Sequence, residues 1–193
     1  MSDKPWSMTE WARGRTWWIR APVLLWVGWM AVSAIRDPEY ESLFRGLNFG
    51  VHEFGHLLFS PFGEFMTIAG GSITQLIVPI GAGALLLWQQ RDWFAVSVCG
   101  LWLAGSLAEL SRYIGDARAL ELNLVTMGEA ASDSDVTGHD WQYLLMKTHL
   151  LQRDTAIAHG CRVIATLLLI ASVLLALRLF YQMATLKPKD QTR

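Results

Sequence analysis

The sequence predicts an all-α protein, a polytopic membrane helical bundle with about five spans and one interfacial helix. Of its 193 residues, 52% are hydrophobic and 17% are charged, and the mean hydropathy is +0.28. This is too apolar for an ordinary soluble protein of this size. Tryptophans stand at the edges of apolar runs, where aromatic side chains settle at a lipid–water interface. They include Trp17, Trp18, Trp88, Trp93 and Trp141.

The net charge indicates which partners to expect, and the two cysteines indicate no redox or metal site. The net charge is −1 and no basic block interleaved with aromatic residues occurs, so we expect the lipid bilayer and no nucleic acid as a partner. Cys99 and Cys161 each stand alone in or beside an apolar run, and we interpret them as packing residues. No small-residue cleavage pattern follows the first apolar run, so we expect no cleavable signal peptide.

The chain divides into three parts. Residues 1–16 form a polar N-terminal lead-in, residues 17–183 form an integral membrane domain, and residues 184–193 form a basic tail. The first span is predicted at residues 21–35. We expect residues 115–160 to be a polar segment within the membrane domain.

A second span is predicted at residues 38–60. Asp37 is a suitable capping residue, Pro38 suits the first helical position, and Glu39 complements the helix dipole. Such a helix would be roughly 33 Å long at 1.5 Å per residue, which matches a bilayer core. Pro61 would end it.

The remaining elements follow from the distribution of apolar residues. Two further spans are predicted at residues 72–88 and 93–114, with a turn-rich link at 64–71 before them. The apolar spacing from Trp141 to His159 predicts a helix on the membrane surface, after a loop at 129–140. We predict the last span at residues 163–181.

The motif His52-Glu53-Phe54-Gly55-His56 lies in the second of these spans and reads H-E-x-x-H. Residues four apart share a helix face, so both imidazoles can bind one metal ion. Glu53 can then act as general base on a water at that metal. We therefore predict a Zn²⁺ site with His52 and His56 as ligands and Glu53 as the catalytic base.

These three side chains can also be explained without a metal. A charged group at the centre of a membrane helix costs about 2.5–3.5 kcal/mol on insertion scales, so such groups are usually functional. Without a metal, the side chains would form hydrogen bonds between helices, or His52 and Glu53 would form a buried pair. We favour the metal site.

A catalytic zinc site also needs a third protein ligand. The candidates are Glu109, Asp116, His139 and Asp140. A cytosolic N-terminus would place the last three on the same membrane side as the end of the histidine-bearing helix. Asp116 and Asp140 can equally be helix caps, and Glu109 a proton-relay or interfacial residue. Spacing alone does not separate these candidates.

The chain resembles the site-2 protease family of intramembrane zinc metalloproteases, in particular its compact bacterial members. The resemblance rests on the H-E-x-x-H motif in an apolar helix, on Gly70-Gly71-Ser72-Ile73-Thr74-Gln75, and on Gly138-His139-Asp140-Trp141 before the last span. It implies a metalloprotease-like domain at residues 17–183, in a bacterial inner membrane. It also implies Asp140 as the third ligand. The Asn-Pro…Leu-Asp-Gly motif of many members is absent, so Asp116 and His139 stay as alternatives.

The expected function is zinc-dependent hydrolysis of a peptide bond in a membrane-embedded or membrane-proximal protein substrate. Gln75 and Ser72 are candidates for contacts with the substrate or the oxyanion, or else for packing of their span. Two other functions were considered: a non-proteolytic membrane zinc protein with a structural or transport site, and an inactive scaffold homologue. Few polar residues in the other spans argue against transport, and the intact motif argues against a scaffold.

Overall fold

The computed structural model describes residues 7–37, 40, 45–122 and 139–186, and within these ranges all regular structure is helical. The prediction of an all-α protein is confirmed for this part of the chain. The helices are α1 (Met8–Ala12), α2 (Ala21–Arg36), α3 (Arg45–Phe59), η1 (Ser60–Phe62), α4 (Glu64–Gln90), α5 (Trp93–Gly115), α6 (Asp140–Lys147), η2 (Leu151–Arg153) and α7 (Asp154–Thr185).

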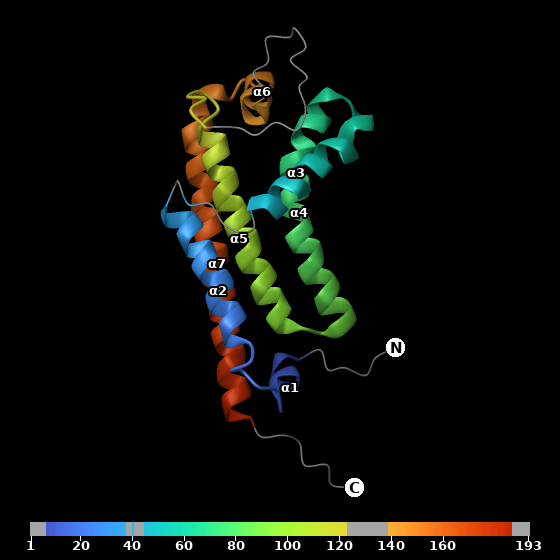
Figure 1. Ribbon diagram of the computed structural model, residues 1–193, viewed down its shortest axis with the longest axis vertical. Coiled ribbons are helices and arrows are strands. Elements are labelled where there is room, and N and C mark those ends of the chain that lie inside the picture. Colours follow the sequence, from blue (N-terminus) through green and yellow to red (C-terminus); the bar gives the residue numbers. More distant parts are fainter. Residues whose placement is uncertain (1–6, 38–39, 41–44, 123–138, 187–193) are drawn as a thin grey trace.

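The long helices form an elongated bundle (Figure 1). Helix α5 is central, because it packs against α2, α4 and α7. Helix α3 packs against α4, and α6 lies at the end of the bundle near the start of α4 and the end of α5. This end of the bundle carries the predicted site.

Three helices of the described chain have the length and apolar character needed to cross a membrane: α4, α5, and α7 together with η2. Helix α2 is apolar but has 16 residues, and α3 has 15. At 1.5 Å per residue they measure about 24 Å and about 22 Å, against about 30 Å for a bilayer core. The three long helices are compatible with a membrane protein, while the predicted five spans are not confirmed.

Apolar side chains cover much of the outside of the bundle, as expected where lipid is the solvent. The exposed ones on α2, α4 and α7 include Leu25, Trp29, Ile77, Trp88, Leu167, Leu174 and Leu177.

The hydrophobic core has two clusters, and α5 contributes to both. The first joins α1 and α2 to α5 and α7, with Trp11 and Leu179 buried in it. The second joins α5, α6 and α7 and includes Ile114 and Leu145. The second cluster fixes α6 against the end of the bundle. The first shows that part of the predicted polar lead-in packs into the core.

The predicted helix at residues 38–60 begins too early. Tyr40 is not helical, and the described helix α3 starts at Arg45. The backbone N–H of Asp37 donates to the carbonyl of Ser33 at 2.8 Å, so Asp37 closes α2. Pro38 and Glu39, the other parts of the expected start signal, lie outside the described residues.

The predicted link at residues 64–71 is wrong, because these residues form the first two turns of α4. The chain turns instead at Gly63, whose φ of +88° is one that glycine adopts readily. The pair Gly70-Gly71 looked like a turn signal but lies inside the helix. A Cβ on Gly70 would lie 2.6 Å from the carbonyl oxygen of Gly55, so this pair serves close packing of α4 on α3.

The predicted helix from residue 141 to 159 is interrupted. Helix α6 ends at Lys147, and His149 has a φ of +58°, which a continuous helix does not allow. A 3-10 turn follows, and α7 starts at Asp154, nine residues before the predicted last span. Residues 129–138 of the predicted loop and 187–193 of the basic tail lie outside the described residues.

Candidate metal centre

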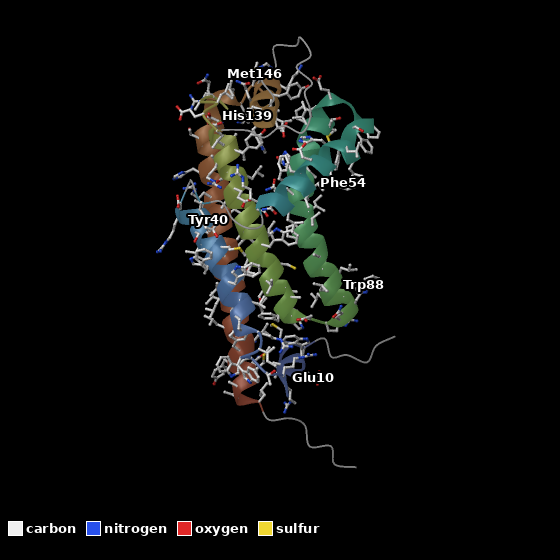
Figure 2. The ribbon with its side chains drawn as sticks, in the orientation of Figure 1. Glu10, Tyr40, Phe54, Trp88, His139 and Met146 are labelled. Atoms are coloured by element: carbon white, nitrogen blue, oxygen red, sulfur yellow. The ribbon has the colours of Figure 1, made fainter. Side chains whose placement is uncertain are left out.

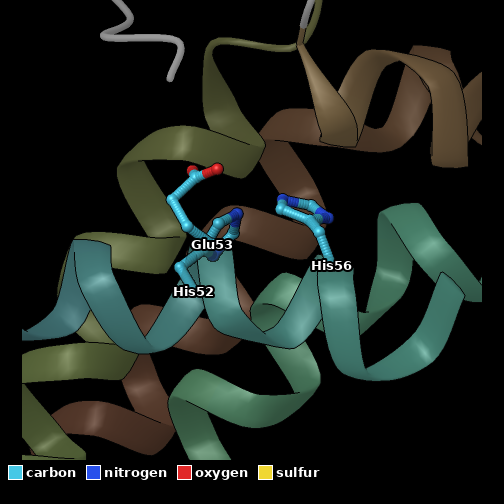
Figure 3. Close-up of side chains that lie close together, drawn as sticks. All are labelled: His52, Glu53 and His56. Carbon is cyan, nitrogen blue, oxygen red and sulfur yellow. The ribbon is translucent and has the colours of Figure 1, made fainter. Parts of the chain in front are cut away.

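The three side chains of the H-E-x-x-H motif extend from the same side of α3 (Figure 3). One potential ligand atom from each of His52, Glu53 and His56 lies within 4.8 Å of the others. The two imidazole rings meet edge to face, with their centroids 4.8 Å apart. The helical spacing of four residues therefore brings both rings to one point, as the sequence predicted.

Asp140, at the start of α6, reaches the same point. Its Oδ2 lies 2.9 Å from Nε2 of His52 and 3.2 Å from Nε2 of His56. Burial would raise the pKa of Asp140, but hydrogen bonds to the two imidazoles outweigh it and hold the pKa of this carboxyl below its usual value. The third group at the histidine pair is thus a carboxylate.

The opposite nitrogens of both rings also face oxygen atoms. Nδ1 of His52 lies 3.2 Å from Oε1 of Gln75, and Nδ1 of His56 lies 2.9 Å from the carbonyl oxygen of Thr67. Acceptors at Nδ1 orient the rings and leave the Nε2 lone pairs for a metal, as in many zinc sites.

The charge pattern at Nε2 fits a cation. A neutral imidazole has one donor and one acceptor nitrogen. Nδ1 of His56 donates to the carbonyl oxygen of Thr67, so Nε2 of a neutral ring carries a lone pair and faces the Asp140 carboxylate, which is also an acceptor. Either a proton or a metal ion must then lie between these two atoms. A single cation between the two Nε2 atoms and this carboxylate satisfies all three lone pairs. Two imidazole nitrogens and one carboxylate oxygen form a common ligand set of catalytic zinc.

Gly71 provides the space for the imidazole of His52. A Cβ at this position would lie 2.6 Å from Nε2 of His52, closer than a side chain can approach. A hydrogen in place of a side chain therefore lets the imidazole lie flat against α4.

Ser72 and Gln75 have positions other than substrate contacts. Both are buried. Ser72 Oγ accepts a hydrogen bond from Trp141 Nε1 at 3.0 Å, which ties α6 to α4, and Gln75 faces His52. Their side chains contact other residues of the centre, which accords with the packing role considered for them, and a contact of either residue with substrate stays a prediction.

The alternative third ligands face each other instead of the histidine pair. Asp116 accepts hydrogen bonds from the backbone N–H groups of Glu121 and Leu122 and lies 3.4 Å from Nε2 of His139. Nδ1 of His139 caps α6 by accepting from the N–H of Gln142. Burial lowers the pKa of His139, and the Asp116 carboxylate opposes this only in part, so the ring is neutral. Both residues position the start of α6.

Glu109, on α5, belongs to a polar cluster around Asn48 of α3. Asn48 lies about one helical turn from the histidine pair. Asn48, four residues before His52, donates to Oε2 of Glu109 at 2.6 Å. The amide oxygen of Asn48 accepts from Trp102 Nε1 at 2.8 Å and from Ser106 Oγ at 3.3 Å. Sequence reasoning did not single out Asn48. The sequence feature that could have indicated it is a single amide side chain on the helix face that also carries His52 and His56.

Tyr113 also escaped notice in the sequence. Its hydroxyl accepts a hydrogen bond from the backbone N–H of Asp140 at 2.9 Å. Its ring lies 4.3 Å from that of His139 and 6.2 Å, edge on, from that of His52. A tyrosine near the end of a span is commonly an interfacial residue, so no sequence signal distinguishes it.

Comparisons of the chain with protein-family models, with curated proteins and with solved structures found no match. The centre is therefore interpreted from its own geometry. The side chains of the three prospective ligands are 12–22% exposed, so each keeps some contact with the surface. Such an arrangement can hold a metal ion with three protein ligands and keep one position for water or substrate.

Proposed function

We propose that this protein is a zinc-dependent hydrolase that cleaves a peptide bond within or next to a membrane. The observation that supports the proposal most strongly is the convergence of His52 Nε2, His56 Nε2 and Asp140 Oδ2, with the Glu53 carboxylate beside them. The same ligand set is the one that the resemblance to the site-2 protease family implies. His52 and Asp140 come from two different helices, α3 and α6, and are 88 residues apart in sequence.

Zinc accords with this ligand set, because two histidines of an H-E-x-x-H helix with one carboxylate are typical of its catalytic sites, although the same ligand types also hold Fe(II) in oxygenases. A zinc ion held by His52, His56 and Asp140 would polarise the scissile carbonyl and lower the pKa of a water to about 7.

Glu53 supplies the proton transfers. Its carboxylate is close to the ligand atoms but belongs to the residue next to His52, so it approaches the centre from a different direction. It accepts the proton of the attacking water and then donates this proton to the leaving amine when the C–N bond breaks. Both transfers need a carboxylate that is free of the metal.

The setting supports a protein substrate in or near the bilayer. Helix α3 carries exposed apolar side chains, among them Leu47, Phe54 and Leu57, beside three helices long enough to span. In this proposal the chain is a multi-pass protein of a bacterial inner membrane, α2 and α3 complete the five spans, and α6 lies at the interface.

A second candidate follows from the position of Glu53. Since its carboxylate belongs to the same group of prospective ligand atoms, it can instead complete a closed four-ligand shell. The centre would then be a structural zinc site in a non-proteolytic membrane protein.

Glu53→Gln separates the two functions. A catalytic base is dispensable for metal binding, so we expect the purified variant to retain zinc while cleavage of a co-expressed single-span substrate is lost. Glu10→Gln is a matched control, because Glu10 lies at the opposite end of the bundle from α6 (Figure 2). Loss of zinc in Glu53→Gln favours the structural site. Equal cleavage by Glu53→Gln and wild type contradicts the protease.

A further inference from the structure

We propose that Tyr113 is a further catalytic residue of this centre. Its hydroxyl donates a hydrogen bond to the carbonyl oxygen of the peptide bond as negative charge develops there. The inference rests on the proposed hydrolysis and adds a group that the H-E-x-x-H motif does not contain.

The first support is position. Tyr113 Oη lies 2.9 Å from the backbone nitrogen of Asp140, and Oδ2 of the same aspartate contacts both imidazoles. The hydroxyl thus lies at the backbone of the residue whose side chain contacts both imidazoles. Tyr113 comes from α5, so it approaches the centre from an element that carries none of the ligands.

The second support is the fixed orientation of the ring. It lies against His139 with centroids 4.3 Å apart and meets His52 edge on at 6.2 Å. His139 is itself held at Nδ1, which accepts from the N–H of Gln142, and it is buried beside Asp116, whose Oδ2 lies 3.4 Å from Nε2. A donor held in this way needs little reorganisation when charge develops, which is the requirement for an oxyanion-stabilising group.

The third support is an available proton. A tyrosine hydroxyl has one donor and two acceptor positions. The N–H of Asp140 occupies an acceptor position, and among the described residues no group accepts the hydroxyl hydrogen of Tyr113. The O–H can therefore donate to a molecule that enters the centre. Ser72 and Gln75, the polar groups predicted for this role, contact Trp141 and His52, and Tyr113 adds a further donor to them.

Tyr113 has the same protonation state before and after the reaction, because Glu53 carries the proton that is transferred. Glu53 takes a proton from water as the new C–O bond forms, and the carbonyl oxygen gains the negative charge. Tyr113 donates a hydrogen bond to this oxygen and keeps its proton. The C–N bond then breaks, the carbonyl re-forms, and the proton on Glu53 moves to the amine.

A positioning role is the competing explanation, since Tyr113 also holds the backbone of Asp140. Tyr113→Phe separates the positioning role from the catalytic role. Tyr143→Phe is the control, because it removes a tyrosine hydroxyl from α6. We expect Tyr113→Phe to retain zinc and KM while kcat falls by about 100-fold, as when one oxyanion donor is removed. A kcat within about threefold of wild type at full zinc overturns the proposal. So does a loss of zinc that accounts for the lost activity.

A binding measurement provides a readout besides activity. The cobalt-loaded protein is titrated with a phosphinic peptide, which imitates the tetrahedral state, and with a simple thiolate, which binds the metal through sulfur alone. Tyr113→Phe should weaken only the phosphinic peptide, by about tenfold or more. Equal weakening of both ligands, or of neither, overturns the role of Tyr113 and leaves the metal site intact. A wild-type protein that binds no cobalt overturns the proposed function itself.

Discussion

Oδ2 of Asp140 lies 2.9 Å from Nε2 of His52, although 88 residues separate the two in sequence. This contact joins α6, at the end of the bundle, to the middle of α3. It rests on three supports: the hydroxyl of Tyr113 on the Asp140 backbone, the bond from Trp141 to Ser72, and the burial of Leu145. The predictions below test what this contact implies.

Asp140→Ala should lose zinc, because two imidazoles alone do not hold the ion against a chelator. Asp116→Ala should keep it, because Asp116 contacts backbone N–H groups and His139 but not the histidine pair. Zinc content after dialysis against a chelator measures both. Full retention in Asp140→Ala together with loss in Asp116→Ala would reverse the assignment of the third ligand.

Gln75→Leu should weaken zinc binding by about 10–100-fold, the usual effect of removing the partner of a ligating histidine. The substitution takes away the oxygen that faces Nδ1 of His52. Gln90→Leu, at the exposed end of the same helix, is the control. Competition with a fluorescent chelator gives both affinities, and equal values would show that Gln75 does not support the ligand.

Gly71→Ala should disrupt the centre, since its Cβ would lie 2.6 Å from Nε2 of His52. We expect lost zinc and a lower unfolding temperature. Gly81→Ala on the same helix meets open space, so it should be neutral or stabilising by about 0.5–1 kcal/mol. Thermal unfolding in detergent distinguishes them. Normal zinc content in Gly71→Ala would contradict the packing of His52 against α4.

Asn48→Leu should reduce the stability of the fold without removing the metal. It takes a donor from the half-buried Glu109 and an acceptor from the half-buried Trp102 and the buried Ser106, and a buried group that loses its hydrogen bond costs about 1–3 kcal/mol. We expect a lower unfolding temperature with zinc retained. An unchanged unfolding temperature would mean that the cluster contributes nothing to stability.

The sequence predicted what depends on local periodicity. The helical class follows from composition, and the shared face of His52 and His56 follows from four-residue spacing. Asp140 was among the candidates, and choosing it needed a resemblance, because spacing carries no information about which loop folds onto a helix 88 residues away.

Other features depended on tertiary contacts and were misread or missed. Gly70-Gly71 has the composition of a turn, and only the approach of α3 explains its place within a helix. The break at His149 has no glycine or proline to mark it, since the residue itself takes the left-handed conformation. Tyr113 contacts the Asp140 backbone only because α6 folds against the end of α5, so its proposed role has no sequence signal.

The most direct test of zinc-dependent hydrolysis uses purified protein in liposomes with a single-span substrate, in water enriched in heavy oxygen. Wild type loaded with zinc should cleave the substrate and place the heavy isotope in the new carboxyl terminus. Glu53→Gln, with the same zinc content, should give neither product nor label. Mass spectrometry of the fragments measures both. Absence of cleavage by the zinc-loaded wild type, or equal labelling by Glu53→Gln, would contradict the assignment of this centre as a peptide-bond hydrolase.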